Sequence, residues 1–327
     1  MMKKTVSILI MMMILTSCNA PERKQYTGVT QGSYYSVIYY DERDFSDEID
    51  SILKDVENSV SLWQENSIIR KVNENKDVIV DKIFIDNFNW AVKAAEFSDG
   101  LFDATIAPLV SAWGFHYKKE IALTDKMIDS ILELVDYRKI RIEEGRVIKD
   151  NENMSLDFNA VAQGYTADII GEYLYSQGIN NYLVDIGGEI TAKGVKPNGE
   201  TWKIGIEKPA PDKNAERVIQ MKIELKDKAV VTSGSYRKYI EKDNVRYSHS
   251  IDPRTGQPVE HNLLSATIIA DNAAWADCLA SICMIAGMEK ASELLKNEDV
   301  EALFIYLDDE NQLQTFQTEG FEKMIVH

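Results

Sequence analysis

Histidine and cysteine are scarce in this chain of 327 residues, which holds four histidines and three cysteines. It contains no HExxH sequence, no CxxC pair, no Walker loop and no GxGxxG sequence. These absences argue against zincin-type peptidases, zinc ribbons and the common nucleotide-binding folds. The G-x-S-x-G spacing of a serine-hydrolase elbow is missing as well.

Positive charge is also in short supply, because 36 Lys and Arg face 53 Asp and Glu and give a net charge of −17. No cluster of Lys and Arg stands out, which argues against nucleic acid as a partner, since phosphate binding needs a basic surface. An anionic substrate would have to be met by local cations, helix N-termini or a metal ion. Cys278 and Cys283 lie five residues apart in an apolar stretch and are expected to be buried thiols rather than a disulfide.

Only the amino terminus carries a long apolar run, from Val6 to Leu15, after Lys3 and Lys4. A basic start and a short apolar core are typical of a secretory signal. The run ends in Leu-Thr-Ser-Cys at Cys18, which resembles the lipobox of bacterial lipoproteins. We therefore expect a signal peptide over 1–17, a lipidated Cys18, a tether over 18–26 and a protein anchored outside the cytoplasm. An ordinary signal peptide with an incidental cysteine is the alternative.

The rest of the chain mixes helix and strand patterns without regular βαβ repeats, which favours an α+β fold. Helical spacing of apolar residues predicts helices over 46–60, 83–97, 124–135, 161–177 and 273–286, with Gly287 ending the last. Strand-like patterns cover 26–40, 182–195, 202–209, 218–225, 228–236 and 300–308.

Four stretches are richer in polar residues and glycine than a core requires. Asp103 sits in an apolar setting before Pro108 and is either a helix cap or a site residue. Asp157 and Asn159 precede a helix and either cap it or border a phosphate site at its free N–H groups. The glycine pair in "DIGGEI" indicates a bulge or a ligand lying on the backbone.

The fourth stretch is the apolar helix 273–286, where Asp277 and Ser281 are four residues apart and share one side. A carboxylate in such surroundings needs a partner. Two interpretations are open: a hydrogen bond to the hydroxyl or a nearby backbone group, or a hard cation such as Mg²⁺, which takes carboxylate, hydroxyl and carbonyl oxygens.

These stretches occur in an order that resembles the FAD:protein FMN transferases, the ApbE-type flavin transferases. The motifs are "GVTQGSYYSV", "SLWQENSIIRKVN", "FDATIAPLVSAWGF", "DFNAVAQGYTAD", "DIGGEI", "SHSIDPRTGQP" and "ADCLAS". The resemblance implies a catalytic domain over 27–327, with mixed or antiparallel sheets flanked by helices in two joined lobes.

The resemblance also implies an activity. Members bind FAD and Mg²⁺, transfer FMN to a threonine or serine hydroxyl of a target protein and release AMP. The targets are outward-facing, flavin-carrying subunits of membrane redox complexes. Two alternatives are a Mg²⁺-dependent FAD pyrophosphatase that yields FMN and AMP, and a flavin-binding lipoprotein without catalysis.

Site residues follow from the resemblance by position. Asp277 and Ser281 are expected as metal ligands through their side chains, and Ala160 through its carbonyl. The FAD site is expected to be lined by Gln31, Trp63, Leu101, Phe102, Asp103, Asp157, Gln163 and Ile251. Three positions depart from the family pattern: Ser281 replaces the usual threonine, Gln163 a frequent Lys or Glu, and Gln31 a frequent methionine.

His249 matches the family histidine beside the diphosphate. A hydroxyl is a weak nucleophile that needs a general base, and a histidine titrating near neutrality suits that role. We therefore expect His249 to be the base or to orient the acceptor, with Asp252 as a residue that could orient the ring. Arg254 is either a phosphate contact or an exposed turn residue, and no motif covers His261.

Overall fold

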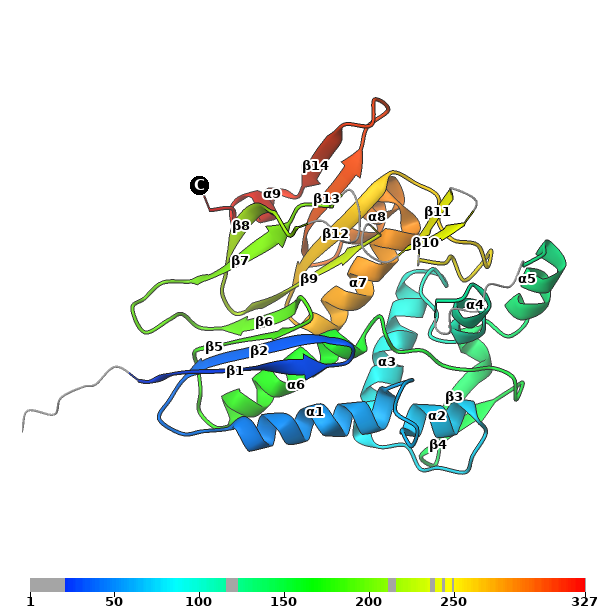
Figure 1. Ribbon diagram of the computed structural model, residues 1–327, viewed down its shortest axis with the longest axis horizontal. Coiled ribbons are helices and arrows are strands. Elements are labelled where there is room, and N and C mark those ends of the chain that lie inside the picture. Colours follow the sequence, from blue (N-terminus) through cyan, green and yellow to red (C-terminus); the bar gives the residue numbers. More distant parts are fainter. Residues whose placement is uncertain are drawn as a thin grey trace, which may run out of the picture.

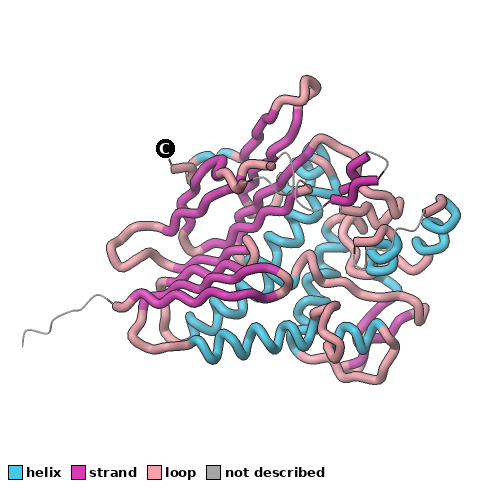
Figure 2. The backbone as a smooth tube through the Cα atoms, in the orientation of Figure 1, coloured by secondary structure: helices cyan, strands magenta, loops and turns pink. Residues whose placement is uncertain are grey.

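The computed structural model describes residues 21–115, 123–210, 216–235, 239–242, 245–248 and 250–326. Its centre is an eight-stranded sheet in the order β1-β2-β5-β6-β9-β12-β13-β14, in which every neighbouring pair is antiparallel. Helices cover one face of this sheet, and a second, two-stranded sheet lies on the other (Figures 1 and 2). The α+β class expected from the sequence is confirmed.

The strands of the large sheet are β1 (Arg23–Thr30), β2 (Ser33–Tyr40), β5 (Tyr182–Ile186), β6 (Glu189–Lys193), β9 (Lys228–Gly234), β12 (Leu263–Ala270), β13 (Glu301–Leu307) and β14 (Leu313–Gln317). Three two-stranded sheets pair β3 (Ile140–Glu143) with β4 (Arg146–Lys149), β7 (Trp202–Glu207) with β8 (Ile219–Leu225), and β10 (Tyr239–Lys242) with β11 (Val245–Ser248).

The helices are α1 (Ser46–Val60), α2 (Ile68–Asn73), α3 (Lys82–Phe97), α4 (Ala107–Ala112), α5 (Asp125–Leu132), α6 (Ala162–Ser176), α7 (Ala273–Ala286), α8 (Met288–Leu295) and α9 (Glu319–Glu322), with a 3₁₀ turn η1 at Tyr137–Lys139. In the described part of the chain, no helix has the length and apolarity needed to cross a bilayer.

Alternation along β2 shows how the two faces of the sheet are used. Tyr35, Val37 and Tyr39 point into the larger core under the helices, whereas Ile38 and Tyr40 pack on the opposite side. This is the period of two that a strand imposes on its side chains. Burying each large apolar side chain is worth about 1.5–3 kcal/mol, so a slip of one residue would expose a whole row of them.

Two local features differ from what the sequence patterns indicated. Residues 26–40 form a hairpin rather than one strand, because Gln31 and Gly32 turn the chain with φ of 48° and 70°. Two successive residues with positive φ are what a two-residue hairpin turn of type I′ needs, and the Gln-Gly pair is a weaker signal for it than Asn-Gly. The short helix α2 was missed, although Ser67 caps it through a hydrogen bond from the Arg70 amide.

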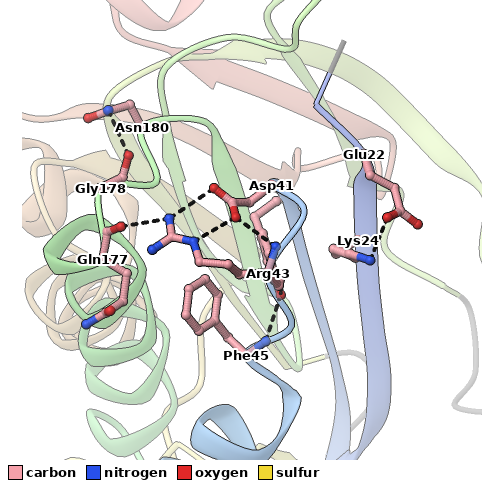
Figure 3. Close-up of polar contacts among 9 residues, drawn as sticks. Glu22, Lys24, Asp41, Arg43, Phe45, Gln177, Gly178 and Asn180 are labelled. Atoms are coloured by element: carbon pink, nitrogen blue, oxygen red, sulfur yellow. Dashed lines mark hydrogen bonds and ion pairs between the residues drawn. The ribbon is translucent and has the colours of Figure 1, made fainter. Parts of the chain in front are cut away.

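Arg43 fixes the end of α6 that lies away from the site described below (Figure 3). Its Nη2 atom donates to the carbonyl oxygen of Gln177 at 2.9 Å, and its Nε atom donates to Asp41 Oδ1 at 2.8 Å. The guanidinium also lies 5.1 Å from the centre of the Phe45 ring. The C-terminal end of α6 is therefore tied to the end of β2, and the start of α6 lies at the other end of the strands.

Candidate functional site

The tip of the β1–β2 hairpin lies against the first turn of α6. Gln31 Nε2 donates to Thr166 Oγ1 at 2.7 Å, and the Thr166 hydroxyl donates to the carbonyl oxygen of Ala162 at 2.6 Å. Since the hydroxyl has one hydrogen, its oxygen must accept from Gln31, which sets the orientation of the amide. The Gln31 backbone N–H donates to Glu57 Oε1 at 2.6 Å. The predicted FAD-site residue Gln31 is thus held from two helices.

A second hairpin turn reaches the same place. Gly187 and Gly188 form the turn between β5 and β6 rather than a bulge inside a strand. The Gly187 N–H donates to the Tyr34 carbonyl oxygen, and the Gly188 N–H donates to Asp185 Oδ1, each at 2.9 Å. A Cβ atom on Gly187 would lie 2.6 Å from Gln163 Nε2. Gly187 has φ of 74°, a conformation that favours glycine, and its missing side chain leaves room for the Gln163 amide.

The residues that precede α6 form a tight turn. Asp157 Oδ1 accepts from the Asn159 N–H at 2.7 Å, and the Asp157 N–H donates to the Ala104 carbonyl oxygen at 2.8 Å. Of the two interpretations of Asp157 and Asn159, the helix cap is not observed, because the N-cap residue is Val161 and its side chain makes no cap hydrogen bond. The first amide of α6 is instead paired with the backbone, since the Ala162 N–H donates to the Phe158 carbonyl oxygen at 2.9 Å.

Where α6 and α7 cross, a carboxylate of each helix accepts hydrogen bonds from backbone N–H groups of the other. The Gly164 N–H donates to Asp277 Oδ2 at 3.3 Å. Asp168, one turn further along α6, accepts from the N–H groups of Ala273 and Ala274, each at 2.8 Å. Burial raises the pKa of Asp168 to about 7, against the opposing effect of these two hydrogen bonds. Asp168 therefore satisfies the start of α7 and fixes the crossing of the two helices.

The expected metal ligands lie on the segments that meet at this crossing, on α7 and just before α6. Asp277 is buried at 5% exposure, Ser281 follows it by one helical turn, and Ala160 lies four residues before Gly164. A carboxylate, a hydroxyl and a carbonyl form an all-oxygen donor set that suits a hard cation such as Mg²⁺. Where the chain is described, no group of three or more His, Cys, Asp and Glu side chains lies together, so a metal here would need the carbonyl and hydroxyl oxygens.

Asp103 is turned into the protein. Its Oδ1 atom accepts from the N–H and hydroxyl of Thr105 at 2.8 and 2.6 Å, and its Oδ2 atom accepts from the Tyr137 N–H at 2.8 Å. Burial raises the pKa of this carboxyl. Leu101 and Phe102 are buried as well. A contact of this segment with FAD would therefore come from its backbone.

Trp63 differs from these buried residues, because 63% of it is exposed in the loop that follows α1. Tryptophan is highly buried on average, so an exposed indole suits stacking on a ligand better than packing in the core.

Ile251 is buried beside α4 and α5, at the start of the turn over residues 251–258. Within this turn, Asp252 accepts two hydrogen bonds from the Arg254 guanidinium, at 3.0 and 2.7 Å. Asp252 and Arg254 therefore pair with each other. His249 and Cys18 lie outside the described residues, so the structure does not test their expected roles.

Sequence reasoning missed four residues that organise this region: Glu57, Thr105, Thr166 and Asp168. Thr166 and Asp168 lie within the stretch 156–170 that was singled out, and Thr166 is four residues after Ala162, the spacing of a hydroxyl that bonds back along a helix. Glu57 had no such signal, because its partner is the backbone of a hairpin far away in sequence.

Comparison with known proteins agrees with the geometry. Residues 31–304 match the sequence model of the ApbE family. An FAD:protein FMN transferase of Vibrio cholerae is 32% identical over 321 residues, which cover 94% of this chain and 95% of that protein. The flavin transferase ApbE from Vibrio cholerae has a solved structure with a TM-score of 0.82 and 30% identity, covering 93% of this chain and 99% of that one. The apo flavinyl transferase ApbE of Pseudomonas stutzeri gives a TM-score of 0.83 at 30% identity, covering 94% and 98%.

Proposed function

The chain belongs to the ApbE family and is an FAD:protein FMN transferase, and we propose that it uses Mg²⁺ to transfer FMN to a threonine or serine hydroxyl of an acceptor protein. The acceptor oxygen forms a new bond to the phosphorus of the FMN half. The bond from that phosphorus to the oxygen that bridges the two phosphates breaks, and AMP leaves with the bridging oxygen. The hydroxyl proton is taken up by a base. The observation that carries the metal part of the proposal is the hydrogen bond from Gly164 to Asp277, which joins the start of α6 to α7.

The metal would be held by Asp277, Ser281 and the carbonyl of Ala160. Bound Mg²⁺ supplies positive charge that offsets the charge developing on the leaving AMP oxygen. The chain itself is acidic, with a net charge of −17, so it offers little general attraction for a diphosphate.

Orientation of FAD is assigned to the two hairpin tips and the exposed Trp63. Gln31 lies at the tip of the β1–β2 hairpin and bonds to Thr166, and Gln163 of α6 lies against the β5–β6 turn at Gly187. His249 is the proposed base for the acceptor hydroxyl, and a positioned base typically contributes about 10²–10⁴-fold. This assignment rests on the family motif that contains His249.

The decisive experiment mixes the protein, FAD, Mg²⁺ and an acceptor domain and measures two products. We expect the mass of the acceptor to rise by one FMN group and one AMP to be released for each group transferred. Rapid AMP release without an acceptor, and no mass change with one, would instead identify an FAD pyrophosphatase. FAD binding without any AMP release would identify a flavin-binding protein.

His249→Ala tests the base. Transfer should fall by about 10²-fold or more while the dissociation constant for FAD changes little. His327→Ala, at the last position of the chain, is the matched control. Transfer by His249→Ala at the rate of the unmodified protein would rule out the assignment.

We also propose that Cys18 is lipidated and holds the enzyme at the outer side of a bacterial membrane, where flavin-carrying subunits of membrane redox complexes are the acceptors. The Leu-Thr-Ser-Cys sequence supports this proposal. In a bacterial host, a labelled fatty acid should enter the full-length protein but not its Cys18→Ser variant. Equal labelling of both would contradict it.

A further inference from the structure

Trp113 makes a hydrogen bond across 143 positions of sequence. Its indole Nε1–H donates to the Gly256 carbonyl oxygen at 2.8 Å. Trp113 follows α4, which begins four residues after Asp103, whereas Gly256 lies in the turn that follows His249 and Ile251. The bond thus joins two stretches that carry proposed site residues.

The 251–258 turn is closed by its own backbone hydrogen bonds and packs closely against α5. The N–H of Gly256 donates to the Asp252 carbonyl oxygen at 2.8 Å, and the Asp252 N–H donates to the Gln257 carbonyl oxygen at 2.9 Å. Gly256 has φ of 67°, and a Cβ atom there would lie 2.6 Å from Cγ2 of Ile128 in α5. The turn therefore has little freedom to shift against α4 and α5.

A small hydrophobic cluster, separate from the two larger cores, surrounds this contact. Leu109, Ile128 and Ile251 are its fully buried members, and Trp113 packs against them. The indole hydrogen bond adds one directional contact between the turn and α4 to the non-directional apolar packing of this cluster.

We propose that Trp113 is a positioning residue for transfer, acting through the 251–258 turn to hold Ile251, a proposed FAD contact, against α4 and α5. The inference rests on the proposed function, since it concerns the alignment of the acceptor hydroxyl with FAD. A displaced turn favours attack by water over attack by the acceptor, because water needs no orientation by the protein surface. Attack by water breaks the same bond and gives free FMN and AMP.

Trp113→Phe removes the N–H donor and keeps an aromatic ring. We expect transfer to fall about tenfold and the ratio of AMP released to FMN transferred to rise from about one to three or more. The dissociation constant for FAD should stay within about threefold. Trp90→Phe is the matched control, because Trp90 stacks on Trp275 in the larger core and does not touch the turn.

Gly256→Ala perturbs the same contact from its other side and should raise the same ratio. The double variant should be no worse than the more affected single variant, since both act through one turn. An unchanged ratio in Trp113→Phe and Gly256→Ala, with transfer reduced only as much as in Trp90→Phe, would overturn the inference. Failure of the unmodified protein to transfer FMN would instead overturn the proposed function.

Discussion

Gly164 of α6 lies directly against the backbone of Ala273 at the start of α7. A Cβ atom on Gly164 would lie 2.7 Å from the carbonyl carbon of Ala273 and closer still to its oxygen. The missing side chain lets the two helices approach until the Gly164 N–H reaches Asp277. The geometry of the proposed metal site therefore depends on a glycine that is not itself a ligand.

Gly164→Ala should damage both stability and transfer, because backbone atoms cannot move aside as a flexible side chain can. We expect the free energy of unfolding to fall by about 1–3 kcal/mol and more Mg²⁺ to be needed for half-maximal transfer. Ser176→Ala, at an exposed position of the same helix, is the control. Denaturation curves and Mg²⁺ titrations provide the measurements, and a variant with unchanged Mg²⁺ requirement would show that the crossing is not coupled to the metal.

Asp277→Asn should lower Mg²⁺-stimulated transfer by at least about 100-fold, because an amide is neutral and a poorer ligand for a hard cation. Ser281→Ala should lower Mg²⁺-stimulated transfer about tenfold. Ser281→Thr, which keeps the hydroxyl, should leave it within about threefold of the unmodified protein. The comparison of alanine with threonine separates ligation from packing. Full Mg²⁺ stimulation in Asp277→Asn would exclude this residue as a ligand.

Asp103→Asn should act mainly on stability. The carboxylate accepts three hydrogen bonds from Thr105 and Tyr137. An asparagine would replace one of the two accepting oxygens by an N–H₂ group, which cannot accept from these donors. We expect a loss of about 1.5–3 kcal/mol in the free energy of unfolding, with a dissociation constant for FAD that changes little in the folded protein. A large loss of FAD affinity without a loss of stability would place the carboxylate in the FAD site instead.

The sequence predicted the regular parts of the fold where local signals were strong. Helix α1 was placed at its observed bounds by apolar spacing, and the end of α7 by Gly287, which has φ of 74°. Thr124, the first residue of the helix predicted over 124–135, caps α5, and Cys278 and Cys283 are buried thiols without a disulfide. Each of these features depends on residues within a few positions of one another.

Features that depend on distant partners could not be predicted in this way. The turn at Gln31 required positive φ at a residue that rarely adopts it, and the hydrogen bond to Thr166 that supports it joins residues 135 positions apart. Asp157 looked like a helix cap because a cap and a turn before a helix use the same residue types. The alternation of apolar and polar residues predicts strands but not their order in the sheet, so the position of β9 between β6 and β12 was also not predicted.

His261 gives the pH dependence of stability that is simplest to test. Its Nδ1 atom accepts from the Leu263 N–H at 3.3 Å, so its Nε2 atom carries the hydrogen and donates to the Met284 carbonyl oxygen at 2.9 Å. This pair of contacts ties the start of β12 to the end of α7. Burial lowers the pKa of His261 below its ordinary value of 6.5, and protonation would also break the bond to Leu263.

Because the folded state binds this proton less readily than the unfolded state, stability should be lost as pH falls below about 6.5, with a slope of at most about 1.4 kcal/mol per pH unit for the one proton. His261→Gln has no such titration. Its free energy of unfolding, measured by denaturant at pH 7.5, 6.5 and 5.5, should therefore decline less with acid than that of the unmodified protein, even if it is lower at pH 7.5. His327→Gln should retain the full decline. Parallel pH dependences for His261→Gln and the unmodified protein would show that other groups govern acid stability and that the tie between β12 and α7 is insensitive to protonation.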